Sequence, residues 1–183
     1  MEKVRAAISM LLLLTPLATL MPAHADSAQE IDRKVDVALN KLYARIPAAK
    51  TLAPKATGIL VFPDIIKAGL GIGGQYGEGA LRKKGTTEAY YQNRGISKGI
   101  QIGAQHYGYA MFFMSEDALK QLDRMDGWEV GVGPSVVVVD EGMAKMMTTT
   151  TLDKEIYAFI FGQKGLMAGV GIQGNKITRI EKH

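Results

Sequence analysis

The sequence predicts an α+β fold: a strongly curved, barrel-like antiparallel β-sheet with a packed N-terminal helix and one further short helix. Three observations support this fold class. One amphipathic helical pattern spans residues 27–46, and after residue 58 the spacing of apolar residues changes from helical to alternating. Glycines also recur at alternate positions, which lets a sheet bend sharply. Because 183 residues suffice for one domain with a core, we expect residues 26–183 to form a single domain.

The N-terminal helix is predicted by its cap and by its apolar spacing. Ser27 and Glu30 match a capping box, in which both side chains satisfy free amide groups at the start of a helix. Pro47 ends the pattern. The apolar positions at helical spacing are Ile31, Val35, Ala38, Leu39, Leu42 and Ile46. The mixed charge of the opposite face favours a helix packed on the sheet over the alternative, a helix lying on a membrane.

Strands are predicted from residue 58 onward. Gly58–Phe62 is a short apolar strand that Pro63 ends, and Val136–Val139 is a buried β-branched run within a later strand. Ser115 provides the cap of one short helix between the strands. A turn is expected at Gln163–Gly165. The later strands are predicted at residues 95–114, 128–140, 156–161 and 166–172.

The stretch Gly69–Gly74 satisfies the G-x-G-x-x-G pattern of a dinucleotide-binding turn. Such a turn must lead from a strand into a helix, but the glycines continue at Gly77 and Gly79, where they disfavour a helix. The same pattern recurs at Gly169–Gly174, where the nine residues that follow are too few for a crossover helix and a return strand. We therefore expect glycine-rich strands and no nucleotide binding.

A second pattern, Gly95–Gly99, matches the G-x-S-x-G nucleophile elbow around Ser97. An elbow requires a strand-to-helix turn and then an acid and a histidine later in the chain. The residues after Ser97 alternate as in a strand, and His106 precedes most of the acids. The absence of cysteine and the separated histidines leave no recognisable metal-ligand set. We expect a protein that is not an enzyme and that uses no cofactor or metal.

Residues 1–25 have the pattern of a secretory signal peptide. Lys3 and Arg5 precede an apolar run over residues 6–21, and a small-x-small site ends at Ala25. We expect cleavage before Asp26 and export to the periplasm or the outside of the cell, with peripheral attachment to a membrane. The chain contains no cysteine, so it has neither a disulfide nor a lipid-modified cysteine.

The basic residues suggest a surface for anions. A formal charge of +4 is too small to indicate nucleic acid but is compatible with an anionic lipid surface. Arg82–Lys84 is a basic cluster at an expected hairpin turn, and either a solvated loop or an anion site explains it. The candidate lipid-binding residues are the basic side chains of Lys67, Arg82, Lys83, Lys84, Arg94 and Lys98.

Several blocks of the sequence resemble one known family, the SYLF (Ysc84-type) domain, in the family's order and over about residues 30–181. The blocks are Ala56–Pro63, Lys67–Gly69, Gly73–Gly79, Gly103–Gln105, Val132–Pro134, Gly165–Val170 and Ile172–Gly174. The resemblance implies a lipid-binding domain, since eukaryotic members are associated with phosphoinositides, membranes and in some cases actin, and bacterial members are mostly exported. This chain departs from the many bacterial members that are lipoproteins, because it lacks the anchoring cysteine.

From the resemblance and the basic residues together we expect non-catalytic binding of anionic phospholipid by an exported envelope protein. The alternative is a structural or interaction module that binds another envelope protein or a host protein. No set of ligand residues can be carried over from the family position by position, so the six basic residues rest on their charge and placement alone.

Overall fold

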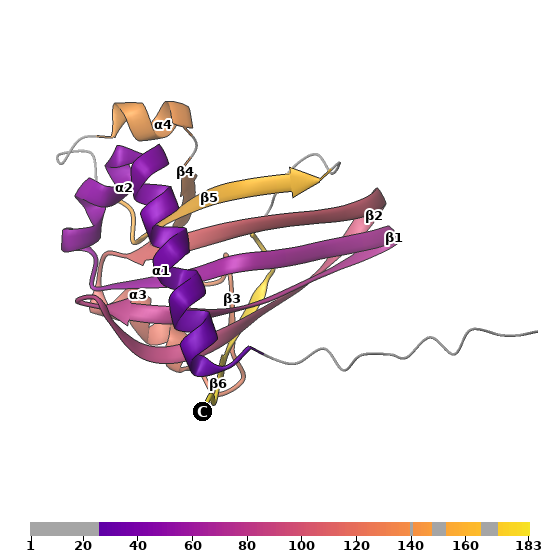
Figure 1. The fold of residues 1–183 in the computed structure, drawn as a ribbon, viewed down its shortest axis with the longest axis horizontal. Helices are drawn as coiled ribbons and strands as arrows, with labels where there is room; N and C mark the ends of the chain where they lie inside the picture. The colour runs from indigo at the N-terminus through magenta and orange to yellow at the C-terminus, as the bar shows by residue number, and fades with distance from the viewer. Residues whose placement is uncertain (1–25, 140, 148–152, 166–171) are drawn as a thin grey trace, which may run out of the picture.

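The computed structural model describes residues 26–139, 141–147, 153–165 and 172–183. The predicted signal peptide lies outside these residues, as does most of the strand predicted at residues 166–172. The described part confirms the predicted α+β class, a curled sheet with helices packed on it (Figure 1). None of the helices in the described ranges has the length and apolar content needed to cross a bilayer.

Two long strands dominate the sheet. β1 (Gly58–Lys83) and β2 (Thr86–Phe113) form one antiparallel ribbon, joined by a tight turn at Lys84 and Gly85, which both have positive φ. β2 also pairs with two further strands along its other edge, one on each half of its length. The remaining strands of the six-stranded sheet are β3 (Trp128–Glu129), β4 (Val136–Val139), β5 (Ile156–Gly165) and β6 (Lys176–Ile180). β4 runs parallel to β5, so the predicted antiparallel sheet contains one parallel pair.

The ribbon is folded back on itself about halfway along its strands. The register shifts between Leu70 and Ile72, and Figure 1 shows both strands extending beyond the helices before they return. We call residues 66–76 of β1 and 94–106 of β2 the ribbon tip. Gly69–Gly74 lies within β1 and Ser97 within β2, which confirms the strand interpretation of both glycine-containing patterns.

Glycine allows the two halves of β1 to lie directly against each other. A Cβ atom built on Gly77 would collide with the side chain of Ile65, and one built on Gly79 would collide with the carbonyl of Val61 and the ring of Phe62. Any larger residue at these positions would force the two layers apart. The alternate glycines of the sequence therefore serve close packing of the folded ribbon.

The convex face of the sheet is covered by helices. α1 (Ala28–Arg45) crosses the ribbon, and α2 (Pro47–Leu52) and α4 (Glu141–Met146) lie beside it (Figure 1). The buried face of α1 packs on the sheet as predicted, against a cluster that includes Val61, Phe112 and Phe159. The predicted cap is present in part: Ser27 Oγ accepts from the Glu30 amide at 3.2 Å, while the Glu30 carboxylate pairs with Lys34.

A second apolar cluster fills the inside of the curl. Its centre is Trp128, whose indole N–H donates to the carbonyl of Val132 at 2.8 Å and whose ring lies 6.0 Å from that of Phe113. The short helix α3 (Glu116–Leu119) and the following 3₁₀ turn close this end, and Ser115 caps α3 as predicted. The base of the ribbon, where residues 58–62 of β1 pair with residues 109–113 of β2, therefore has apolar side chains packed on both of its faces.

Several predicted boundaries were wrong. Pro63 does not end a strand: β1 continues through it, because a register shift between Phe62 and Ile65 accommodates a residue without an N–H. β5 continues through the turn predicted at Gln163–Gly165. Only Val139 of the valine run is fully buried, since β4 lies at the edge of the sheet. α2, α4 and β6 were not predicted.

Candidate functional site

A groove of about 430 Å³ lies between α1 and the rim of the sheet. We call it the basic groove. From α1 it is lined by Arg33, Val37 and Lys41, which are spaced by four residues and so project from one face of the helix. The opposite wall comes from β1, β2 and β5 and includes Asp64, His106 and Lys164. Four segments that are separate in the chain thus meet at one site.

The floor of the basic groove is apolar. Val37 is 42% exposed there, beside Pro63 and the ring of Phe161. A glycine at position 108 makes room for this ring, since a Cβ atom built on Gly108 would collide with Phe161. The floor thus offers apolar contact to a ligand that enters between the helix and the sheet.

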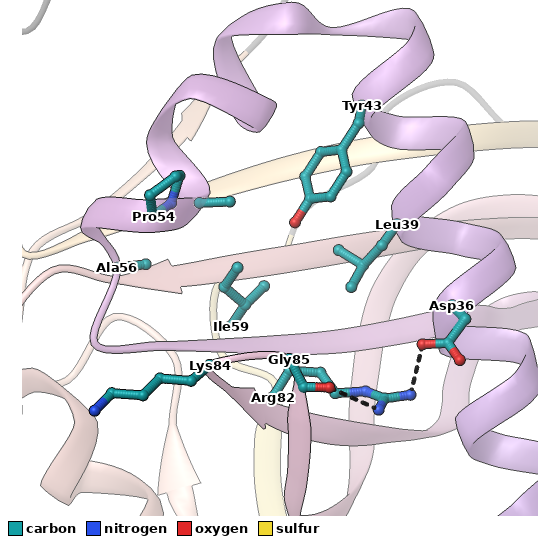
Figure 2. Close-up of a pocket in the computed structure, with 10 residues that line it drawn as sticks. Asp36, Leu39, Tyr43, Pro54, Ala56, Ile59, Arg82, Lys84 and Gly85 are labelled. Carbon is teal, nitrogen blue, oxygen red and sulfur yellow. Dashed lines mark hydrogen bonds and ion pairs between the residues drawn. The ribbon is translucent and has the colours of Figure 1, made fainter.

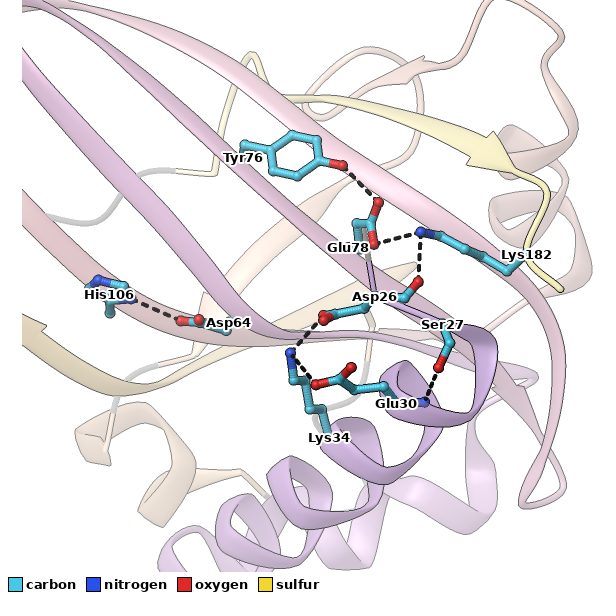
Figure 3. A network of polar contacts seen from close by, with 9 residues as sticks. All are labelled: Asp26, Ser27, Glu30, Lys34, Asp64, Tyr76, Glu78, His106 and Lys182. Atoms are coloured by element: carbon cyan, nitrogen blue, oxygen red, sulfur yellow. Dashed lines mark hydrogen bonds and ion pairs between the residues drawn. The ribbon is translucent and has the colours of Figure 1, made fainter. Parts of the chain in front are cut away.

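Positive charge predominates around this floor. Within the described residues, the side chains of Arg33, Lys41 and Lys164 have no hydrogen-bond or ion-pair partner. Asp64 is the single acid among the described residues that line the groove, and its Oδ1 lies 3.2 Å from Nδ1 of His106 (Figure 3). The groove therefore combines unpaired cations with an apolar surface, an arrangement that suits an anionic amphiphile.

Lys34 also lines the groove, but carboxylates hold it in place. Its Nζ lies 2.7 Å from Asp26 and 3.3 Å from Glu30 (Figure 3). Burial lowers the pKa of Lys34, but its hydrogen bonds and ion pairs with Asp26 and Glu30 outweigh burial and raise the pKa. Lys34 is therefore charged, with its charge partly compensated by the two acids.

The structure separates the six basic residues proposed from sequence. Arg82, Lys83 and Lys84 lie at the β1–β2 turn, whereas Lys67, Arg94 and Lys98 belong to the ribbon tip, at the other end of the folded half of β1. Among the five whose side chains the structure describes, Lys67, Arg82, Lys83, Lys84 and Arg94, none lines the basic groove.

Arg82 is not a solvated turn residue. Its side chain is 12% exposed, and its Nη2 donates to Asp36 Oδ1 at 2.8 Å (Figure 2). The same nitrogen donates to the carbonyl of Asp32 at 3.1 Å. These contacts fasten the turn to α1. Lys84 is exposed and lines a second pocket beside Arg82 and Tyr43. The Nζ atom of Lys83 lies 4.0 Å from Oε1 of Glu88.

The other three residues have different surroundings. Lys67 is buried, with 5% of its surface exposed. Arg94 lies over the ring of Tyr76, with its Cζ atom 5.8 Å from the ring centroid. The backbone of Lys98 is paired with that of Ile72 in the ribbon tip. The lipid-binding role of these residues stays a prediction.

A polar network ties the start of α1 to β1 and to the C-terminal residues that follow β6. Lys182 Nζ donates to Glu78 Oε2 at 2.7 Å and to the carbonyl of Asp26 at 2.9 Å, and the side chains of Lys182 and Glu78 are 10% and 9% exposed (Figure 3). The Tyr76 hydroxyl donates to Glu78 Oε1 at 2.8 Å. Burial, and then the bond to Glu78, raise the pKa of Tyr76 to about 12. Both carboxylate oxygens of Glu78 and the carbonyl of Asp26 accept hydrogen bonds within the network, which indicates that the network has a structural role.

The interior of the folded ribbon becomes polar toward the tip. The buried polar residues of the described chain are Lys67, Gln75, Asn93, Gln105 and Asn175, and they all belong to the ribbon tip or its immediate surroundings. Tyr107 donates to Gln75 Oε1 at 3.0 Å. Among the described residues, several amide atoms of this group have no partner. The apolar core therefore ends before the tip does.

Comparison with known proteins finds similarity to a protein family and to a bacterial protein. Residues 94–182 match the family described as "Ysc84: Las17-binding protein actin regulator". This part of the chain is therefore similar to the Ysc84/SYLF domain family, a family known for lipid binding. The chain is also 30% identical, over 159 residues, to a protein named Beta cell expansion factor A from Aeromonas veronii. That alignment covers 86% of this chain and 59% of the relative, so the chain spans less than two thirds of the relative's length.

The basic groove was missed by the sequence analysis. The spacing of Arg33, Val37 and Lys41 could have indicated the helical side, because residues four apart share a helix face. The wall formed by Asp64, His106 and Lys164 had no such signal, since these residues come from three different strands and only the tertiary fold brings them to α1.

Proposed function

We propose that this protein binds anionic phospholipid without catalysis and that the basic groove contacts the lipid. The observation that carries the proposal is the set of cations without partners in the described chain, Arg33, Lys41 and Lys164, around the apolar floor formed by Val37 and Phe161. Phosphate oxygens would meet the cations, and the apolar part of the lipid would meet the floor. The family's lipid binding supports the same chemistry.

The expected strength follows from the charges. Near an anionic surface each basic residue contributes about 1 kcal/mol, so three cations contribute several kcal/mol at low salt. Salt weakens this attraction, because exposed charges are screened over about 8 Å at physiological ionic strength. The pattern of residues 1–25 supports export, and we propose that the lipid surface belongs to the cell envelope.

The proposal is tested by sedimentation with phosphatidylcholine vesicles that contain increasing phosphatidylglycerol. The wild-type protein should sediment in proportion to the anionic lipid and less at high salt. The triple variant Arg33→Gln, Lys41→Gln, Lys164→Gln should bind at least tenfold more weakly at low salt, because about 1 kcal/mol per cation is lost. All three side chains project from the surface without partners in the described chain, so folding should be retained.

A matched control removes the same charge elsewhere. Lys50, Lys55 and Lys145 are exposed and also have no partner among the described residues. Their replacement by glutamine should leave binding near the wild-type level. Equal losses in both triple variants would show that net charge acts without the groove. Wild-type protein that binds no vesicle at any anionic content would contradict the proposal and favour a protein partner.

A further inference from the structure

The ribbon tip carries the most exposed isoleucines of the described chain. Ile96 is 81% exposed and Ile72 69%, and Ile66 and Tyr76 are each more than 40% exposed. The tip extends beyond the helices (Figure 1), so α1, α2 and α4 do not cover these side chains. Large apolar side chains gathered at one projecting end of a molecule mark an interaction surface.

The strand register places these residues on one face. Gly74 is opposite Ile96, and Tyr76 is opposite Arg94. Residues directly opposite in an antiparallel pair point to the same side, and so do residues two apart along a strand. Ile72, Tyr76, Ile96 and Arg94 therefore share the outer face of the tip. Gly74 adds no side chain between the two isoleucines.

The charge of the tip identifies the kind of partner. Residues 65–77 and 93–106 contain no aspartate or glutamate. Lys67 is buried, whereas Arg94 is exposed and lies over the Tyr76 ring at the edge of the isoleucine face. A surface whose apolar side chains lie beside a cation, in segments without acids, is complementary to an anionic bilayer, where phosphates lie above an apolar layer.

The hydrogen bonding of the tip limits how deep it can go. β1 and β2 pair with each other through most of the tip, so each strand satisfies the backbone groups of the other on one side. Within the described residues, β2 pairs with β6 only up to Arg94 and with β5 only from Gln105. The outer edges between these points need water or head groups as partners, because unpaired backbone groups are costly in hydrocarbon. The tip can therefore enter the interface but cannot span a bilayer.

We propose that the ribbon tip is a membrane-inserting wedge: Ile72 and Ile96 enter the apolar layer of an anionic bilayer while Arg94 stays with the phosphates. The inference rests on the proposed lipid function and adds the element that enters the bilayer. The basic groove and the tip are separate contacts. His106 lines the groove and is paired with Ile66 of the tip, so the two surfaces adjoin.

Tryptophan reporters test the insertion directly. Trp128 is the single tryptophan of the chain and is fully buried, so it provides a constant background. Ile96→Trp places a reporter at the tip, and Met125→Trp places one at a residue that is fully exposed outside the tip. With anionic vesicles whose acyl chains carry bromine, the fluorescence at position 96 should shift to the blue and be quenched. The fluorescence at position 125 should change in neither way.

Affinity gives a second measurement. The double variant Ile72→Ser, Ile96→Ser should bind phosphatidylglycerol-containing vesicles at least tenfold more weakly, while Ile72→Leu, Ile96→Leu should bind like wild type. Circular dichroism should show both variants folded, because the replaced side chains are exposed. The serine variant keeps every cation, so its loss of binding would be due to apolar contact.

Three results would overturn the inference. Vesicle binding without quenching at position 96 would leave the lipid function standing and remove the tip from the bilayer. A blue shift at position 96 that grows with protein concentration in the absence of vesicles would show that a second copy of the chain covers the tip. Full binding by the serine variant would show that the isoleucines are not needed. Failure of the proposed function itself is different, because wild-type protein would then bind no vesicles.

Discussion

Tyr107 shows how one buried phenol links pH to stability. Its hydroxyl donates to Gln75, and burial raises its pKa to about 12 although the bond to Gln75 works in the opposite direction. Tyrosinate forms more easily in the unfolded chain, where the phenol has its ordinary pKa of 10.0. The stability contributed by the neutral phenol is therefore complete below about pH 10 and is lost as the pH rises toward about 12.

Tyr107→Phe should lower the free energy of unfolding by about 1 kcal/mol at neutral pH, because Gln75 loses its partner. The variant should also lose less stability than wild type as the pH rises above 10, since it has one fewer phenol to ionise. Urea unfolding at several pH values measures both effects. Parallel pH profiles for the two proteins would contradict the assignment. Tyr109, whose pKa burial raises well above its ordinary range, is present in both proteins.

At the residue scale, the sequence predicted contacts between residues within one helical turn, but it did not predict contacts between residues far apart in the chain. The caps by Ser27 and Ser115 were predicted because their partners lie three residues away. Arg82 was expected to lie in a solvated loop or an anion site because it belongs to a basic cluster, but its partner Asp36 is 46 residues distant. A charged residue in a basic cluster gives no sign of which carboxylate the fold will bring to it.

At the scale of elements, the glycines of β1 separate two roles that the sequence alone does not distinguish. Gly79→Ala should lower the free energy of unfolding by about 1–3 kcal/mol, because the new methyl group meets the carbonyl of Val61 in the facing layer. Gly74→Ala is the matched control, since a Cβ atom there meets nothing within 4 Å. Chemical denaturation measures both. Equal effects would show that the layers are not in close contact.

The same strand explains why predicted boundaries failed. The local rule for proline favoured an end at Pro63, but β1 continues through it. A proline can remain in a strand where the register shifts, and that shift is decided by the pairing with β2. β6 was missed because the segment Lys176–Ile180 is short, and its pairing with β2 is what makes it a strand.

At the scale of the whole molecule, the fold class followed from periodicity, whereas the basic groove depends on topology. The amphipathic pattern of residues 27–46 and the later alternation sufficed to predict a helix on a curved sheet. The groove requires β1 to fold back so that Asp64 and His106 reach α1. No local pattern specifies how far a ribbon folds, so the site could be found only in three dimensions.

The change from an apolar to a polar interior along the ribbon has a consequence for local opening. At the base, Leu60 and Phe113 pack in the apolar core. Around Gln75 and Asn93, by contrast, the interior contains side-chain amide atoms that lack partners in the described chain. Native-state hydrogen exchange should therefore divide each long strand into two regimes. Amides of residues 58–62 and 109–113 should exchange only through global unfolding, and those of residues 72–76 and 93–96 through smaller openings. Mass spectrometry of exchanged peptides would resolve the two regimes, and uniform protection along β1 would contradict them. A single strand would then be rigid where the helices pack on it and able to open at the tip, where we propose that it contacts the bilayer.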